Sequence, residues 1–123
     1  MNEKTILIIE DEEDAAELFS EMMRVSGFRV LKTSSSAPAL DMISVQTSDL
    51  VILDLMLPEV SGLEILRAMR GDPKLAQIPV VIVSAKGTPA DIRTGMEAGA
   101  TLYLVKPVGF LDLREAVANA LGS

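Results

Sequence analysis

Short runs of aliphatic residues alternate along the chain with longer stretches in which apolar residues recur every three or four positions. The short runs are nearly continuous and occupy residues 5–9, 50–53, 80–83 and 102–105, with residues 28–31 as a weaker fifth run. Continuous apolar runs of this length are typical of strands in a parallel sheet that is covered on both faces. The pattern therefore predicts five buried parallel strands.

The stretches between these runs have the apolar spacing of amphipathic helices. In the first stretch the apolar residues predicted to share one face are Ala15, Leu18, Phe19, Met22 and Val25. The last stretch repeats the pattern with Leu113, Ala116, Val117, Ala120 and Leu121. Residues 36–46, 61–70 and 89–97 show it less completely. Five helices are therefore expected, one after each strand.

Local signals mark where some of these helices begin and end. Ser61 and Glu64 have the spacing of a capping box, and Thr88 precedes a proline and Asp91, which is typical of a helix start. Glycines stand where two helices would end, at positions 27 and 99.

Five strands that alternate with five helices predict an α/β sandwich of three layers with right-handed crossovers. A chain of 123 residues without a repeat or a low-complexity tract is expected to form one domain, residues 1–123. In such sheets ligands bind at the carboxyl ends of the strands, so the residues that follow each strand are the candidates for function.

Polar residues follow four of the predicted strands. Glu10 and Asp11 follow the first, Asp54 the run at 50–53, Ser84 the next and Lys106 the last. Each residue taken singly has an ordinary explanation, such as a helix cap or a solvated lysine. Together they are informative, because three acids at one edge repel one another unless a cation binds there.

The composition narrows the chemistry of this edge. The chain has no cysteine and no histidine, which excludes disulfides, thiolate metal sites and the commonest general base, and leaves hard cations such as Mg²⁺. The formal net charge of -7 argues against direct binding of nucleic acid. No apolar run approaches the roughly 20 residues of a membrane span, so a soluble, cytoplasmic protein is expected.

Acids, a cation, a hydroxyl and an ammonium together are typical of a site for phosphoryl transfer. Asp54 is the predicted nucleophile because it ends a central hydrophobic strand whose rigidity would orient it. Glu10 and Asp11 are expected to hold the cation instead.

Four segments in their order along the chain resemble the blocks of a response-regulator receiver domain, the CheY-like phosphoacceptor module of two-component signalling. They read ILIIEDEED, LVILDLMLPEVSGLE, VVIVSAK and EAGATLYLVKP, and the resemblance covers essentially the whole chain. It implies a flavodoxin-like sheet of order 2-1-3-4-5. It also implies that Asp54 accepts a phosphoryl group from a phosphohistidine on a sensor histidine kinase or a histidine phosphotransfer protein.

The resemblance further implies roles for single residues. Mg²⁺ would be held by Asp11, Asp54 and the main-chain carbonyl of Met56, with Glu10 acting through water. Ser84 would be the hydroxyl that turns toward the phosphoryl group, and Lys106 the lysine that pairs with it. Tyr103 would be the aromatic residue that moves inward with Ser84, and the bond from Lys106 to Pro107 would be cis. The resemblance therefore implies a phosphoacceptor signalling domain and not an enzyme.

Positions two residues after the acceptor and after the hydroxyl residue influence attack by water in such domains. They are Met56 and Lys86 here. An apolar Met56 cannot orient a hydrolytic water, so a persistent phosphoryl state is expected.

The chain departs from the family pattern near its output surface. Ala100, Thr101 and Leu102 replace a segment that commonly carries an acidic pair, and the phenylalanine that often follows Lys-Pro is displaced to Phe110. The sequence therefore leaves two routes by which the domain could pass on its signal: a downstream protein partner, or an effector domain missing from this sequence.

Three other functions are less consistent with the sequence. A haloacid-dehalogenase-type enzyme would need an acid at position 56, where the chain has methionine, and a flavodoxin-like redox protein would need a hydroxyl-rich phosphate loop and aromatic residues around a flavin. A receiver that serves as a docking or dimerising module without phosphorylation is the remaining alternative, against which the complete set of acids, hydroxyl and lysine argues.

Overall fold

The computed structural model describes residues 3–35, 38–46 and 48–122, and these residues form alternating strands and helices. The strands are β1 (Thr5–Ile9), β2 (Arg29–Thr33), β3 (Leu50–Leu53), β4 (Val80–Ser84) and β5 (Leu102–Val105). The helices are α1 (Glu13–Val25), α2 (Ala39–Gln46), α3 (Gly62–Gly71), α4 (Pro89–Glu97) and α5 (Phe110–Gly122). The predicted strands are confirmed to within two residues at each end, and Ser84 is the last residue of β4 and does not follow it. Residues 36 and 37, which the sequence pattern assigned to the second helix, lie outside the described residues.

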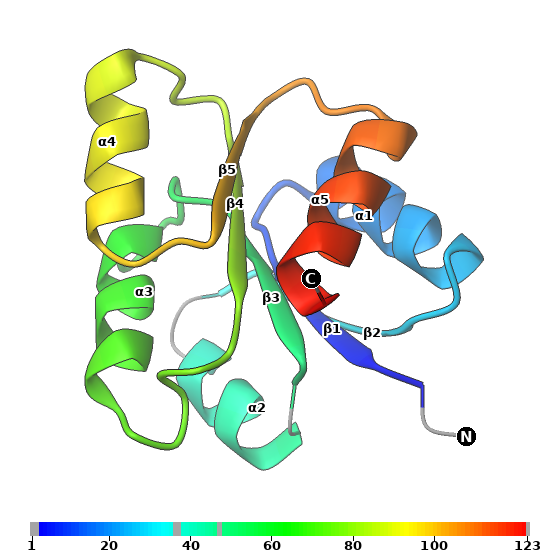
Figure 1. Ribbon diagram of the computed structural model, residues 1–123, viewed down its shortest axis with the longest axis horizontal. Coiled ribbons are helices and arrows are strands. Elements are labelled where there is room, and N and C mark those ends of the chain that lie inside the picture. The colour runs from blue at the N-terminus through cyan, green and yellow to red at the C-terminus, as the bar shows by residue number, and fades with distance from the viewer. Residues whose placement is uncertain (1–2, 36–37, 47, 123) are drawn as a thin grey trace.

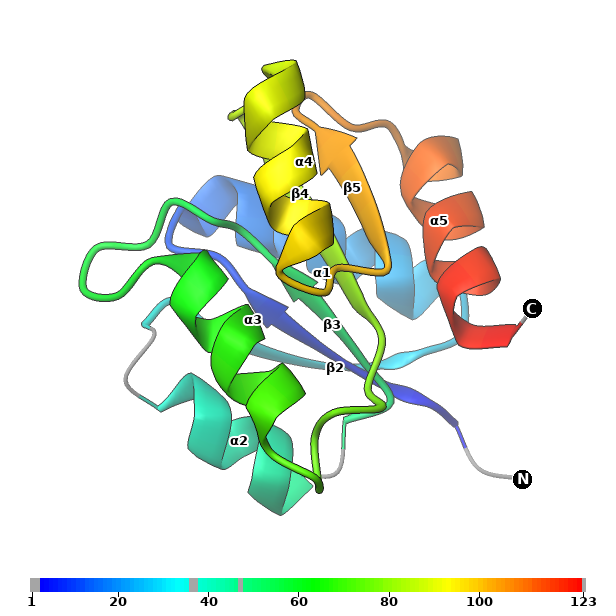
Figure 2. The ribbon, with the colours of Figure 1, turned by 60° about the vertical axis from the view of Figure 1, so that its left-hand side comes forward.

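The strands form one parallel sheet of order β2-β1-β3-β4-β5, as the resemblance implied. Helices α1 and α5 cover one face of the sheet, and α2, α3 and α4 cover the other (Figure 1). Figure 2 shows the same three layers from another side, with α3 and α4 in front of the sheet and α1 behind it. The predicted three-layer α/β sandwich is therefore confirmed.

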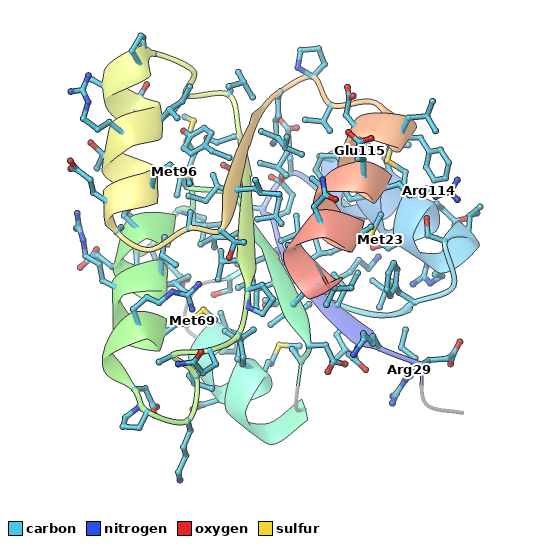
Figure 3. All side chains as sticks on the ribbon, viewed as in Figure 1. Met23, Arg29, Met69, Met96, Arg114 and Glu115 are labelled. Atoms are coloured by element: carbon cyan, nitrogen blue, oxygen red, sulfur yellow. The ribbon has the colours of Figure 1, made fainter. Side chains whose placement is uncertain are left out.

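Aliphatic side chains fill two core layers, one on each side of the sheet. Residues of β1 and β3 point alternately into both layers, which explains why these strands read as continuous apolar runs. Met69 of α3 belongs to one layer and Met23 of α1 to the other, and Figure 3 shows them on opposite sides of the sheet. The rigid centre of the molecule is thus the pair of strands that carries Glu10 and Asp54.

Helix ends follow the local signals in most places. Thr88 and Asp91 form a complete capping box at α4, with their reciprocal bonds at 3.1 and 3.3 Å. Ser61 caps α3 by accepting a bond from the N–H of Leu63 at 3.2 Å. Gly27 and Gly99 follow α1 and α4 with φ of 99° and 114°, a conformation that favours glycine.

The predicted apolar face of α1 is covered only in part: Phe19 is buried, and Ala15 and Met22 pack partly buried against the core. The structure buries Ala16, Phe19, Ser20 and Met23. Leu18 and Val25, which the apolar spacing assigned to the covered face, are 53% and 74% exposed. The apolar arc of this helix is wider than the sheet can cover, so its outer part remains on the surface beside α5.

Candidate functional site

The carboxyl ends of the central strands bring the predicted acids together. Glu10 and Asp11 follow β1 and Asp54 follows β3, and β1 and β3 are hydrogen-bonded neighbours. The main-chain N–H of Asp54 donates to the carbonyl of Ile9 at 3.0 Å, which continues the strand pairing up to the acceptor residue. Carboxylate oxygens of all three acids lie within 4.8 Å of one another, although the residues come from two segments more than 40 positions apart.

Both carboxylate oxygens of Asp54 accept hydrogen bonds. Oδ1 accepts from the main-chain N–H of Met56 at 2.9 Å, and Oδ2 accepts from Nζ of Lys106 at 3.0 Å. The residue is only 5% exposed, so its position is fixed by the strand and by these two bonds. The predicted nucleophile is therefore a buried, oriented carboxylate at the edge of the sheet.

Lys106 is shared between two acids. Its ammonium donates to Oε1 of Glu10 at 2.8 Å as well as to Asp54, and its side chain is 19% exposed. Burial opposes its charge, but the hydrogen bonds that it donates to Glu10 and Asp54 raise the pKa of Lys106 above its ordinary value. The lysine is thus held as a cation against two buried carboxylates.

Glu10 is 3% exposed and is held from two sides. Its Oε1 accepts the bond from Lys106, and its Oε2 accepts one from the N–H of Glu12 at 3.2 Å. Burial raises the pKa of Glu10 to about 7, and Asp54 contributes to that rise while Lys106 opposes it. One ammonium does not neutralise three carboxylates, so this edge retains negative charge that a bound cation or a proton would offset.

Ser84 and Tyr103 are linked through the loop after β4. The Ser84 side chain is fully buried, and its Oγ accepts a bond from the N–H of Lys86 at 3.3 Å. The Tyr103 hydroxyl donates to the carbonyl of the same Lys86 at 2.5 Å. The hydroxyl of Tyr103 is therefore bonded to the protein rather than left in water. The Lys106–Pro107 peptide bond is cis, which confirms the expectation from the resemblance.

Gly62 is a residue of the site that the sequence reasoning missed. A Cβ atom at this position would lie 2.4 Å from the main-chain oxygen of Asp54 and 2.8 Å from Cα of Leu55. Its N–H donates to the carbonyl of Leu55 at 3.0 Å, so the start of α3 packs directly on the segment after β3. The available signal was a glycine in the first turn of a predicted helix. Glycine is a poor helix former, so its presence there indicates that another segment packs too closely to leave room for a side chain.

Comparison with known proteins identifies the family. Residues 6–118 match the model of the response regulator receiver domain. The chain belongs to the response regulator receiver family. It is therefore a phosphoacceptor signalling domain of two-component systems, the class that the four sequence blocks resemble.

Relatives of the receiver family match over nearly the whole chain. The polar-differentiation response regulator DivK of Brucella ovis is 34% identical over 119 residues, 97% of each chain. A putative response regulator from Chloroflexus aurantiacus superimposes with a TM-score of 0.94 at 31% identity, over 98% of both chains. The superposition over nearly the whole chain agrees with the strand order of this receiver.

A third structure, at 24% identity, supports the fold alone. It is the receiver domain of the sensor histidine kinase PA1611 from Pseudomonas aeruginosa, described with a magnesium ion coordinated in the active site cleft. It has a TM-score of 0.91 and covers 99% of this chain and 100% of its own.

Among the described ranges of the present chain, no helix has both the length and the apolar content to cross a bilayer.

Proposed function

We propose that Asp54 accepts a phosphoryl group from a phosphohistidine of a sensor histidine kinase or a histidine phosphotransfer protein. The observation that carries this proposal is the carboxylate of Asp54, which is buried at the end of β3, bonded to Lys106 and within 4.8 Å of carboxylate oxygens of Glu10 and Asp11. We also propose that residues 1–123 form one receiver domain, because the family match spans residues 6–118.

The transfer is a displacement at phosphorus. A carboxylate oxygen of Asp54 forms the new O–P bond while the N–P bond of the donor breaks. The electron pair of that bond stays on the imidazole nitrogen of the donor, which leaves as histidine. Lys106 already bonds Asp54, and this contact supports a role for its ammonium in neutralising the phosphoryl oxygens.

The acid cluster fits a divalent cation of the Mg²⁺ type. Three carboxylates with one ammonium leave excess negative charge. Burial raises the pKa of Glu10, and the neighbouring Asp54 adds to that rise. Asp11 and Asp54, with the carbonyl of Met56, would hold the ion, and Glu10 would act through water. When bound, Mg²⁺ neutralises charge on the transferred phosphoryl group. The Pseudomonas aeruginosa receiver, which shares this fold, is described with a magnesium ion in its active site cleft.

An apolar surface beside the acceptor fits the partner that donates the phosphoryl group. A hollow of about 330 Å³ is lined by Leu18, Phe19, Pro107 and Val108 together with Ala15 and Lys106. Lys106 thus borders both the hollow and Asp54. A helix packed against this surface would bring its phosphohistidine toward the acceptor, so we propose it as the docking face for the kinase or phosphotransfer protein.

Phosphorylation would then change the surface that downstream partners bind. Added negative charge on Asp54 would attract the Ser84 hydroxyl and Lys106, and the loop after β4 would follow, because Ser84 and Tyr103 are both bonded to Lys86. In this proposal the protein acts in the cytoplasm, where phosphohistidine is formed from ATP. Its phosphorylated form acts on a protein partner or a linked effector domain and does not bind nucleic acid directly.

The test is phosphorylation with acetyl phosphate and Mg²⁺, followed by intact-mass measurement. Wild type should gain one phosphoryl group, Asp54→Asn should gain none, and Asp14→Asn, an exposed acid on α1, should behave as wild type. Chelation of Mg²⁺ should abolish the modification. An unmodified wild-type chain would instead favour the module that docks or dimerises without phosphorylation, and modification of Asp54→Asn would assign the acceptor elsewhere.

A further inference from the structure

The ring of Tyr103 lies against a helical glycine of α4. A Cβ atom built on Gly95 would lie 2.8 Å from Cε2 and 2.9 Å from Cδ2 of the Tyr103 ring. It would also lie 3.0 Å from Cδ1 of Ile82, whose strand position pairs with Tyr103. Carbon atoms do not approach so closely without displacement, so the ring occupies space that any other residue at position 95 would fill.

The ring is fixed beyond this contact as well. Its hydroxyl donates to the carbonyl of Lys86 at 2.5 Å, and its Cα belongs to β5, which is paired with β4. The backbone of α4 is fixed in turn by the capping box of Thr88 and Asp91. Neither the helix nor the strand can yield easily, so an added Cβ would act mainly on the ring.

A second glycine shows that the same loop packs closely on β5. A Cβ atom at Gly87 would lie 2.7 Å from Cγ1 of Val105. The loop after β4 therefore packs on β5 at Gly87 and is hydrogen-bonded to it through the Tyr103 hydroxyl. Glycine destabilises a helix interior relative to alanine, and the space needed by the Tyr103 ring gives the reason for the presence of Gly95 in the last turn of α4.

We propose that Gly95 is a positioning residue: its missing Cβ leaves the space in which the Tyr103 ring lies between α4 and β5, and so couples the loop after Ser84 to the α4–β5 surface. The steric part stands on the geometry alone. The coupling part rests on the proposed function, because it concerns what happens after phosphorylation of Asp54.

The steric part is tested by titrating the phenol of Tyr103 in the absence of any phosphoryl donor. The chain has one tyrosine and no tryptophan, so ultraviolet absorbance reports on this residue alone. Burial raises the pKa of Tyr103, and Asp91 and Asp54 add to the rise while a hydrogen bond with Ser84 opposes it. In Gly95→Ala the Tyr103 ring should move into solvent. The titration midpoint of its phenol should then fall to that of a free tyrosine, about 10.

Gly71→Ala is the matched control, because Gly71 is the last residue of α3 and a Cβ there would meet nothing within 4 Å. This variant should titrate as wild type. A wild-type midpoint in Gly95→Ala would overturn the proposal.

A double variant keeps the test decisive if Gly95→Ala folds poorly. In the wild-type background Gly95→Ala should lower the midpoint of thermal unfolding. In a Tyr103→Ala background, where the ring is absent, the same change should not lower it. An equal loss in both backgrounds would overturn the steric role.

The coupling part is read from the methyl resonance of Met96, which neighbours Gly95 and is 42% exposed on α4. Beryllofluoride with Mg²⁺ should shift this resonance in wild type and not in Gly95→Ala, while acetyl phosphate still modifies both chains equally. A retained Met96 shift in Gly95→Ala would overturn the coupling. Loss of phosphorylation in wild type would count against the proposed function and leave the tyrosine titration as a separate measurement.

Discussion

The ammonium of Lys106 lies 3.0 Å from Oδ2 of Asp54, although 52 residues separate them in the chain. The same ammonium lies 2.8 Å from Oε1 of Glu10. One lysine thus serves as the counter-charge of two buried acids, with Asp11 as a third acid close by. One ammonium leaves negative charge on this pocket, and that charge favours the binding of a second cation.

Removal of this lysine should destabilise the fold. Lys106→Met leaves Glu10 and Asp54 without their counter-charge, and the free energy of unfolding should fall by about 2–3 kcal/mol, less than for a fully buried pair because the Lys106 side chain is partly exposed. Urea denaturation monitored by circular dichroism measures the change. Lys32→Met is the control, because the Lys32–Glu17 pair is a surface contact at 2.6 Å and its loss should have little effect. Equal effects of the two variants would contradict the role of Lys106.

Asp11 should determine the response to Mg²⁺. In EDTA, Asp11→Asn should stabilise the protein by up to about 1 kcal/mol, because it removes one of three repelling carboxylates. With Mg²⁺ at ten times its dissociation constant, wild type should gain about 1.4 kcal/mol and Asp11→Asn little or nothing. Thermal unfolding of wild type, Asp11→Asn and the exposed control Asp14→Asn separates the two effects. A full Mg²⁺ gain in Asp11→Asn would exclude Asp11 as a ligand.

The stability of the metal-free protein should fall with rising pH through Glu10. The pKa of Glu10 is about 7 in the folded protein and 4.5 for the free side chain, so between these values the folded state binds more protons than the unfolded state. Its contribution is complete below pH 4.5 and is lost as pH rises through about 7. We expect a loss on the order of 1–2 kcal/mol, less than the full shift because the pocket opens to water at the exposed Asp11.

Glu10→Gln isolates this contribution. Urea denaturation in EDTA at about pH 5 and about pH 8 should show a smaller difference in the free energy of unfolding for Glu10→Gln than for wild type. Glu13→Gln, an exposed acid at the start of α1, should retain the wild-type difference. If Glu10→Gln also retains the wild-type difference between the two pH values, Glu10 is not the source of the pH dependence.

Met56 should prolong the phosphoryl state. Its N–H holds Asp54, but its side chain is 51% exposed at the mouth of the pocket and offers no group to orient water. Met56→Asn should shorten the lifetime of the phosphorylated chain about tenfold, which corresponds to about 1.4 kcal/mol of activation free energy. Intact mass followed over time after removal of acetyl phosphate measures the decay, and Met96→Asn on α4 is the control. Equal lifetimes of Met56→Asn and wild type would show that another feature controls hydrolysis.

Much of the architecture could be predicted because its signals are local. The aliphatic runs gave strands within two residues of their observed ends, since a strand buried on both faces needs no polar position. Thr88 with Asp91, and the glycines at 27 and 99, marked helix ends because caps satisfy backbone groups within a few residues. The acids at the ends of the first and third strands were predicted to lie at one edge, because parallel strands deliver their carboxyl ends to the same side of a sheet. That these two strands are neighbours was implied by the resemblance to receiver domains, and the structure confirms it.

Other features depended on which surfaces the folded chain brings together. The spacing in α1 could not tell which part of its wide apolar arc the sheet would cover, and Leu18 and Val25 remained exposed. The sharing of Lys106 by Glu10 and Asp54, and the contact of Gly95 with the Tyr103 ring, join segments far apart in the chain. Residue type and spacing therefore determined the elements and the chemistry of the strand ends, whereas distances of a few ångströms between remote segments were decided by packing, which no local pattern records.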